Sequence, residues 1–105
     1  RRNSGLKPQT REKLQTITSP VKIDVFVTLT CPYCPMMAGL AHRFAMENEN
    51  ITASAIDAQE FPVLANYYQV SAVPKTVING LHHLEGALPE DRFLAELLKF
   101  AGGPQ

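Results

Sequence analysis

The sequence predicts a single α/β domain, over residues 21–102, in which helices flank one four-stranded mixed sheet. Three observations predict it. A chain of 105 residues with 45% hydrophobic content can bury one core but has no room for two. A strand, a helix and a second strand follow one another in residues 21–57, which indicates a parallel βαβ unit. Two short strands then flank Asn79-Gly80, a strong hairpin signal, so an antiparallel hairpin completes the sheet.

Residues 1–20 are polar and basic, with five Lys or Arg residues and one acidic residue. Pro8 suits the first turn of a short helix, in which Leu14 and Ile17 would lie on one side. The segment has no interleaved aromatic residues, and the chain as a whole has a formal net charge of zero. We therefore expect a basic, solvated linker with a possible short helix, and no binding of nucleic acid.

Residues 21–29 are rich in β-branched side chains and mostly apolar on both faces, which predicts a central strand covered above and below. The helix after it is expected to end near Glu49. Its apolar residues recur at helical spacing and would face the sheet: Met37, Leu40, Ala41, Phe44 and Ala45. Residues 51–57 predict the second strand, joined to the first by a right-handed crossover.

Pro62 is a suitable start for another short helix, which the segment 70–74 ends. The buried face of this helix is predicted to consist of four residues: Val63, Leu64, Tyr67 and Tyr68. Residues 75–78 and 81–85 then predict the two strands of the hairpin.

The last helix is predicted to begin at Pro89, where Glu90 and Asp91 suit the positive end of the helix dipole. It would end at Gly102-Gly103-Pro104, a sequence that stops helices. Its buried side chains are expected to be apolar: Phe93, Leu94, Leu97, Leu98 and Ala101.

Cys31 and Cys34 are the residues that point to chemistry. Cys31 would follow the central strand and Cys34 would lie in the first turn of the next helix, so backbone N–H groups and the helix dipole favour a Cys31 thiolate. Such placement lowers the pKa of a thiol from about 8.5 toward about 3.5–7.5. Cys31 is therefore predicted as the nucleophile and the more shielded Cys34 as the resolving thiol. Between them, Pro32 and Tyr33 are expected to tune the redox potential and to meet substrate.

The same cysteine spacing also serves zinc and iron–sulfur sites. Zinc needs four ligands, and beyond the cysteine pair the chain offers His42, His82 and His83. His42 is expected on the solvated side of its helix. His82 and His83 are neighbours in a strand and point to opposite faces, so at most one could join a site. We expect no metal and no other cofactor, and a metal carrier is a minor alternative.

With strand, C-x-x-C, helix and a later Val73-Pro74 in this order, residues 21–102 resemble the thioredoxin and glutaredoxin superfamily, whose members have the thioredoxin fold. By this resemblance, Pro74 would have a cis bond facing the cysteines, and the Val73 backbone would pair with bound substrate. The Cys-Pro-Tyr-Cys motif is typical of glutaredoxins and of the C-terminal unit of two-unit protein disulfide oxidoreductases. The second resemblance is the closer one, and it rests on further segments: Val27-Thr28-Leu29-Thr30, Pro35, Val77-Ile78-Asn79-Gly80 and Gly86-Ala87-Leu88-Pro89-Glu90.

Two departures from these relatives change the expected chemistry. Glutaredoxins carry a Gly-Gly and polar residues that hold glutathione, whereas residues 85–88 read Glu-Gly-Ala-Leu, so glutathione dependence is not expected. Thioredoxins carry a Trp before the first cysteine and a buried Asp in the preceding strand. This chain has no Trp, and Asp24 is one residue out of step with that Asp, whose place would be taken by Val25. A buried acid for proton transfer is therefore not carried over.

The expected function is exchange of protein disulfides, as a thiol–disulfide oxidoreductase, through Cys31 and Cys34. An electron-relay domain of a larger redox protein is one alternative. A non-catalytic module that binds partner proteins on the apolar surface near Tyr33 and Pro74 is another. The resemblance implies protein thiols and disulfides as partners, with a second thioredoxin-fold unit and a thioredoxin-reductase-like electron donor.

The sequence also gives expectations for the cellular location of the chain and for the protein to which it belongs. No apolar run is long enough to span a bilayer and no secretory signal is present, so we expect a cytoplasmic protein without membrane partners. The chain starts at Arg1 without a Met, and its basic first segment suggests a fragment that an N-terminal unit would precede.

Overall fold

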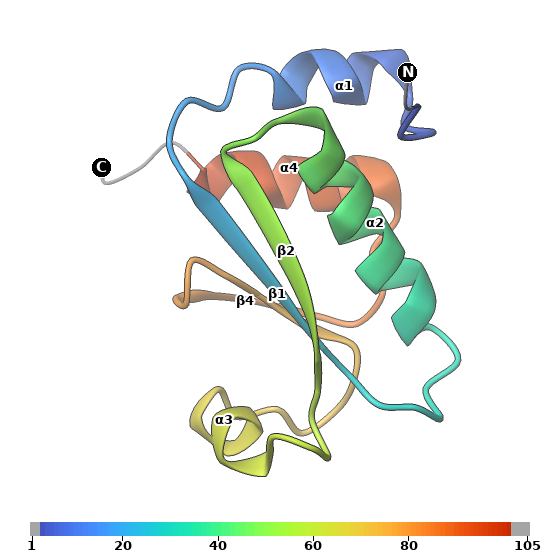
Figure 1. Ribbon diagram of the computed structural model, residues 1–105, viewed down its shortest axis with the longest axis vertical. Helices are drawn as coiled ribbons and strands as arrows, with labels where there is room; N and C mark the ends of the chain where they lie inside the picture. The colour runs from blue at the N-terminus through green and yellow to red at the C-terminus, as the bar shows by residue number, and fades with distance from the viewer. Residues whose placement is uncertain (1–2, 102–105) are drawn as a thin grey trace.

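The structure is a computed structural model that describes residues 3–101 (Figure 1). Its elements are, in order, α1 (Pro8–Leu14), β1 (Val21–Val27), α2 (Cys34–Glu47), β2 (Ile51–Asp57), α3 (Pro62–Tyr67), β3 (Lys75–Ile78), β4 (His82–Glu85) and α4 (Glu90–Phe100). The strand order is β2-β1-β3-β4, with β1 and β2 parallel and the other neighbours antiparallel. The predicted α/β class and four-stranded mixed sheet are confirmed.

The central strand β1 separates two apolar layers because its side chains alternate between the faces of the sheet. Val21, Ile23 and Val25 belong to the larger core cluster, which α1, α2 and α4 complete. Phe26 faces the other way into a small cluster with Ala65 of α3 and Val77 of β3. The sheet is thus well covered on one face and only partly covered on the other.

The first segment packs onto the domain, so the expectation of a solvated linker is wrong for residues 3–20. The predicted short helix is present as α1, but three apolar side chains around it are buried in the main core: Leu6, Leu14 and Ile17. Charged residues of the same segment contact acidic side chains of other helices, as in the 3.2 Å pair between Arg11 and Glu47. The charged residues give the segment its basic composition, but its few apolar residues determine where it packs.

Some predicted boundaries are one or two residues too long. β1 ends at Val27, where its pairing with Asp57 of β2 ends, and Leu29 is exposed. α2 ends at Glu47, and β4 begins at His82 because Leu81 belongs to the turn. Pro89 precedes α4 as its N-cap, and the predicted stop at Gly102-Gly103-Pro104 lies outside the described residues.

The predicted buried face of α3 is also wrong. Val63 is 83% exposed, Tyr67 is 75% exposed and Leu64 is exposed as well, while Ala65 is the residue of the helix that is buried. Tyr68, just after α3, is half-buried, with its ring 5.7 Å from that of Phe26. The helix lies beyond one end of the sheet (Figure 1), so only one narrow side of it meets the strands.

The hairpin between β3 and β4 turns at Asn79 and Gly80 as predicted. Both residues have positive φ, at 56° and 70°, which the tight primed turn requires and which Asn and Gly tolerate best. The Asn79 Oδ1 atom accepts a 2.8 Å hydrogen bond from the Lys22 N–H, which ties the turn to β1. No helix within residues 3–101 has the length and apolarity that a membrane crossing needs, and the cytoplasmic location stays a prediction.

Candidate redox site

Cys31 and Cys34 meet at the start of α2, and the structure joins them in a disulfide with a Cα–Cα distance of 5.5 Å. Cys34 is the first residue of α2 and is only 2% exposed. Cys31 lies in the loop after β1 and is half-buried. Cys31 is therefore the more accessible residue of the pair, which supports the predicted order of attack.

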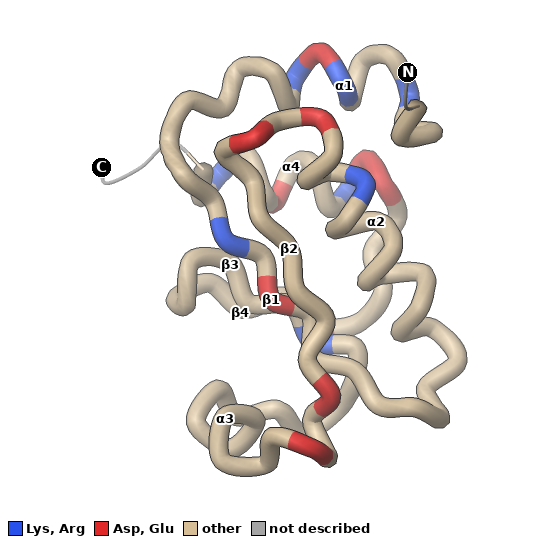
Figure 2. The backbone as a smooth tube through the Cα atoms, in the orientation of Figure 1, with Lys and Arg blue, Asp and Glu red and all other residues tan. Residues whose placement is uncertain are grey.

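The start of α2 is an electrostatically simple environment. Its N-cap is Tyr33, which makes no side-chain hydrogen bond to the first turn. No Lys, Arg, Asp or Glu occurs from residue 25 to residue 42, and the charge-coloured tube is uncoloured along this loop (Figure 2). The partial positive charge of the helix N-terminus would therefore act on a Cys31 thiolate with no charged side chain in the redox loop itself.

The loop before β3 brings the Val73–Pro74 pair to the cysteines. The peptide bond between them is cis, as the resemblance predicted. The Cys31 Sγ atom lies 3.7 Å from the Val73 carbonyl oxygen, although the two residues are 42 positions apart. Pro74 is buried, and its carbonyl oxygen accepts a 2.9 Å hydrogen bond from the Gly86 N–H. The structure therefore brings Cys31, Cys34, Val73 and Pro74 together.

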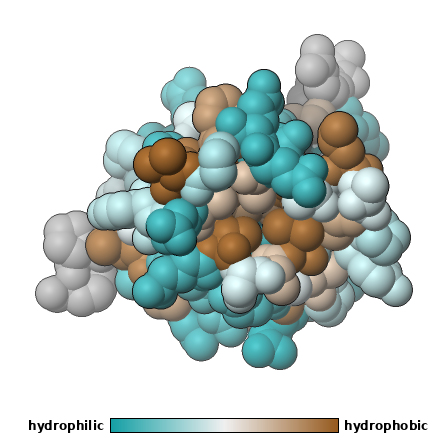
Figure 3. All heavy atoms as spheres, turned by 90° about the horizontal axis from the view of Figure 1, so that it is seen from below, coloured by the Kyte–Doolittle hydropathy of each residue, from teal (hydrophilic) through white to brown (hydrophobic). Residues whose placement is uncertain are grey.

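Pro32 and Tyr33 lie on the open side of this cluster, and both are exposed. Figure 3 shows the end of the molecule that lies lowest in Figure 1, where apolar side chains gather near the centre of the face. The substrate-binding roles of Pro32, Tyr33, Val73 and Pro74 remain predictions that this placement permits.

Asp24 is buried but does not face the cysteines. It lies on the opposite side of β1 from Val25, and Val25 packs into the core that α2 covers. Its carboxylate lies 3.6 Å from the ammonium of Lys22, on its own side of the strand. The absence of a thioredoxin-type acid beneath α2, inferred from the sequence register, agrees with this arrangement.

The three histidines make separate contacts. His42 is hydrogen-bonded through Nδ1 to the Ala38 carbonyl oxygen at 2.8 Å. His82 stacks on Phe100 with ring centroids 3.8 Å apart, while His83 points to the other face of β4. Over residues 3–101, no three His, Cys, Asp or Glu side chains are grouped as a metal site would need.

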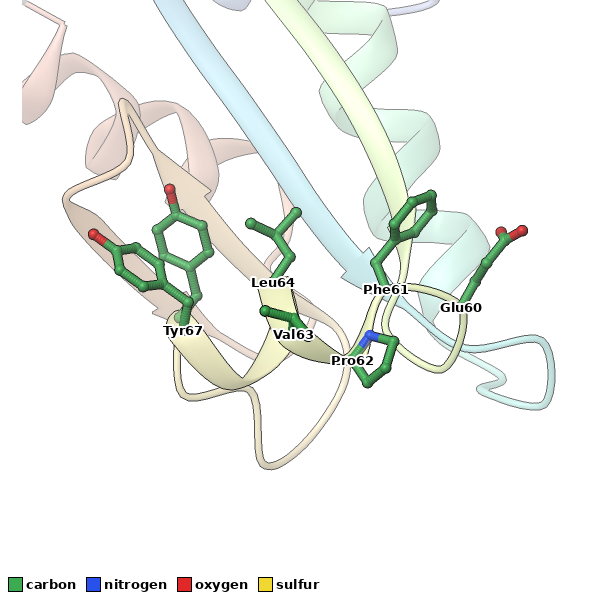
Figure 4. A pocket seen from close by; sticks show the side chains of 7 residues that line it. Glu60, Phe61, Pro62, Val63, Leu64 and Tyr67 are labelled. Atoms are coloured by element: carbon green, nitrogen blue, oxygen red, sulfur yellow. The ribbon is translucent and has the colours of Figure 1, made fainter.

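The structure has two features that the sequence does not predict. An open, apolar pocket of about 620 Å³ runs along α3, lined by exposed side chains that include Phe61, Val63 and Leu64 (Figure 4). Lys75, the residue after Pro74, is buried. The sequence of α3 is visibly apolar, which predicts burial, whereas the structure exposes most of these side chains. A lysine in a strand next to a proline carries no sequence signal for burial.

Residues 21–99 match the family of the thioredoxin domain. Among characterised relatives, a thioredoxin of Methanocaldococcus jannaschii is 35% identical over 82 residues, which make up 77% of this chain and 95% of the relative. This match covers nearly the whole of that relative.

Solved structures of related proteins have the same fold. A protein disulfide oxidoreductase of Aeropyrum pernix superposes with a TM-score of 0.91 at 38% identity, over 96% of this chain and 46% of that one. The NTD_N/C domain of the alkylhydroperoxide reductase AhpF of Enterococcus faecalis superposes with a TM-score of 0.82 at 26% identity, over 88% of this chain and 44% of that one. This chain thus spans about half the length of both structures. By its sequence and by its fold, the chain belongs to the thioredoxin domain family.

Proposed function

We propose that this chain exchanges disulfides in protein substrates, with Cys31 as the nucleophile and Cys34 as the resolving thiol. The observation that carries the proposal is the unequal exposure of two bonded sulfurs. Cys34 is 2% exposed at the first position of α2, whereas Cys31 is half-buried and lies beside the Val73 backbone. The likeness to the Aeropyrum pernix protein disulfide oxidoreductase supports the same substrate class.

The reaction transfers two electrons in two displacements. The Cys31 thiolate attacks one sulfur of a substrate disulfide, and the other substrate sulfur leaves as a thiolate that takes a proton from water. Cys34, after losing its proton, attacks the Cys31 sulfur of the mixed disulfide. The remaining substrate sulfur leaves as a thiol, and the enzyme is left with the Cys31–Cys34 disulfide seen in the structure. The reverse sequence oxidises a substrate dithiol.

The surroundings of Cys31 favour a polypeptide over glutathione. Glutathione carries carboxylates, which proteins usually bind with Lys, Arg or backbone N–H groups. The segment 25–42 has no Lys or Arg, and its exposed residues include Pro32 and Tyr33. Such an uncharged surface suits an extended, largely apolar segment whose backbone runs beside that of Val73.

Reduction of insulin by dithiothreitol tests this proposal. We expect the wild-type chain to accelerate the reaction and Cys31→Ser to abolish the acceleration, because the exposed nucleophile is lost. Cys34→Ser should retain the first displacement and accumulate a mixed disulfide on Cys31, detectable by mass spectrometry of the intact protein. Equal rates for wild type and Cys31→Ser would refute the proposal, and a mixed disulfide formed by Cys31→Ser through Cys34 would reverse the order of attack.

A second candidate is an electron-relay domain, which the likeness to the AhpF domain favours. In that role the natural partners would be a flavoprotein donor and a neighbouring redox unit, and free protein disulfides would react slowly. Stopped-flow reduction of the oxidised chain by a thioredoxin reductase with NADPH separates the two roles. Rapid reduction together with slow insulin turnover indicates a relay, and fast turnover of insulin indicates a general protein disulfide oxidoreductase.

A further inference from the structure

Lys75 is a buried lysine whose ammonium makes two hydrogen bonds and one ion pair. It is the first residue of β3, directly after Pro74, and is 3% exposed. Its ammonium donates hydrogen bonds to the carbonyl oxygens of Tyr68, at 2.8 Å, and Gln69, at 3.1 Å. The third neighbour is the Glu85 carboxylate of β4, at 3.4 Å. Three acceptors thus surround a group that has three N–H donors.

These contacts join the two ends of one loop. Tyr68 is the C-cap of α3, so the Lys75 ammonium meets carbonyl groups at the negative end of that helix. From Gln69, which has a positive φ of 57°, the chain continues through the exposed residues Ser71 and Ala72 to Val73. The Lys75 side chain closes this segment, residues 68–74, into a small ring.

The far end of the ring is the part that touches the redox site. The Val73 carbonyl oxygen lies 3.7 Å from the Cys31 sulfur. Pro74 is held from outside the ring by the hydrogen bond from the Gly86 N–H at 2.9 Å. Lys75 is therefore the side chain that fixes the start of the loop, whose end presents the Val73 backbone.

Stability alone does not account for a lysine at this position. The other residues of β3 are buried, and Val77 and Ile78 among them are apolar. Lys75 pairs with Phe26 of β1, so its side chain lies on the face of the sheet that carries the cluster around Phe26. Burying an ion there requires that its loss of hydration be offset by well-placed partners, and an apolar residue of similar size is often neutral or stabilising at such sites. What an apolar residue cannot do is bind the two carbonyl oxygens.

We propose that Lys75 is a positioning residue for the redox site: its buried ammonium holds the loop of residues 68–74 so that the Val73 backbone is preset to pair with a polypeptide substrate at Cys31. This inference rests on the proposed function, because it concerns the binding of an extended protein segment. A preset backbone lowers the entropy lost on binding. Loss of the Lys75 ammonium should therefore raise KM for protein disulfides. It should not change the rate with small disulfides, because these do not pair with Val73.

The variant Lys75→Met tests this inference, since Met keeps the length and apolar stem of the side chain and removes its donors. With insulin as substrate, we expect KM to rise about fivefold, roughly the factor that one net hydrogen bond represents, with kcat unchanged. The rate with bis(2-hydroxyethyl) disulfide should stay at the wild-type value. Glu85→Gln is the matched control, because it removes the exposed ion-pair partner and leaves both carbonyl contacts in place, and its KM should equal that of the wild type.

A second variant guards against a fold defect in Lys75→Met. Insertion of two glycines between Ser71 and Ala72 lengthens the exposed loop and leaves Lys75 untouched, so it should raise KM for insulin in the same way. An unchanged KM in both variants would overturn the inference, as would equal losses with insulin and with the small disulfide. If the wild-type chain does not reduce insulin at all, it is the proposed function that fails.

Discussion

Two buried threonines differ in whether their hydroxyl groups are paired. Thr10 and Thr76 are both fully buried. The Thr10 hydroxyl donates a 2.6 Å hydrogen bond to the Glu90 carboxylate, whereas the Thr76 hydroxyl has no partner. A buried polar group without a partner costs about 1–3 kcal/mol, while a hydrogen bond to a charged group contributes about 1.5–3 kcal/mol. Similar side chains therefore have opposite effects on the stability of the fold.

Replacement of each threonine by valine, which has nearly the same shape, separates these effects. We expect Thr76→Val to raise the free energy of unfolding by about 1 kcal/mol, because the unpaired hydroxyl is removed. Thr10→Val should lower it by about 2 kcal/mol, because the Glu90 carboxylate loses a buried donor. Urea denaturation of both variants measures the two values. Destabilisation by Thr76→Val would mean that its hydroxyl is hydrogen-bonded in solution.

The residues of the redox site differ in how well the sequence predicts them. Cys31 and Cys34 are found because their spacing and the strand and helix around them are local features. The cis bond at Pro74 follows from resemblance and is confirmed. The burial of Lys75 and Thr76 is not predicted, because it depends on backbone carbonyl groups and on pairing with β1, which no local sequence pattern identifies. Local patterns identify the reacting atoms, and tertiary contacts decide what holds them in place.

The regular elements are predicted more closely than their exposed faces. Periodicity places all four strands and the helices α2 and α4 within about two residues, because their apolar residues recur at regular intervals, whereas α1 ends at Leu14 and does not include Ile17 as predicted. A helix with one clear apolar side also shows which of its sides is buried. α3 lacks this property, because its six residues are apolar almost all round. The side of α3 that is buried depends on the part of the sheet that the helix contacts, and the sequence of the helix alone does not show this.

The exposed side of α3 gives a direct test at the level of the element. We expect Val63→Leu to change the free energy of unfolding by less than about 0.5 kcal/mol, because residue 63 faces solvent. Ala65→Leu should lower it by about 1–3 kcal/mol, since the larger side chain must enter the cluster of Phe26 and Val77. Thermal or urea denaturation measures both changes. A larger destabilisation by the substitution at residue 63 would instead indicate that Val63 is buried, as its sequence predicts.

At the scale of the whole molecule, the redox site and the helix α1, which completes the core, lie at opposite ends of β1. The redox loop leaves the carboxyl end of this strand, whereas α1 lies near its amino end (Figure 1). α1 is held there by buried apolar side chains and by polar contacts with α4, one of which raises the pKa of Lys7 through its hydrogen bond to Asp91. The first segment thus completes the core without approaching the cysteines.

The role of the first segment could not be predicted from its composition. Charged and polar residues dominate residues 1–20, and the aliphatic side chains of the segment that join the main core are Leu6, Leu14 and Ile17. Their spacing is too wide to form a regular helical stripe, because Leu6 and Ile17 lie outside the helix. They become a single apolar surface only after the chain has bent around α1, which is a property of the tertiary structure.

Replacement of Leu14 tests whether α1 stabilises the fold without affecting the redox site. It is fully buried in α1, so Leu14→Ala should lower the free energy of unfolding by about 3 kcal/mol through lost burial and the cavity left behind. At a temperature where the variant remains folded, its kcat/KM for insulin should equal that of the wild type, because α1 touches none of the residues around Cys31. Lys13→Ala, at an exposed position of the same helix, is the control and should change neither quantity. A folded Leu14→Ala variant with reduced kcat/KM would show that the packing of α1 is coupled to the redox loop through α2.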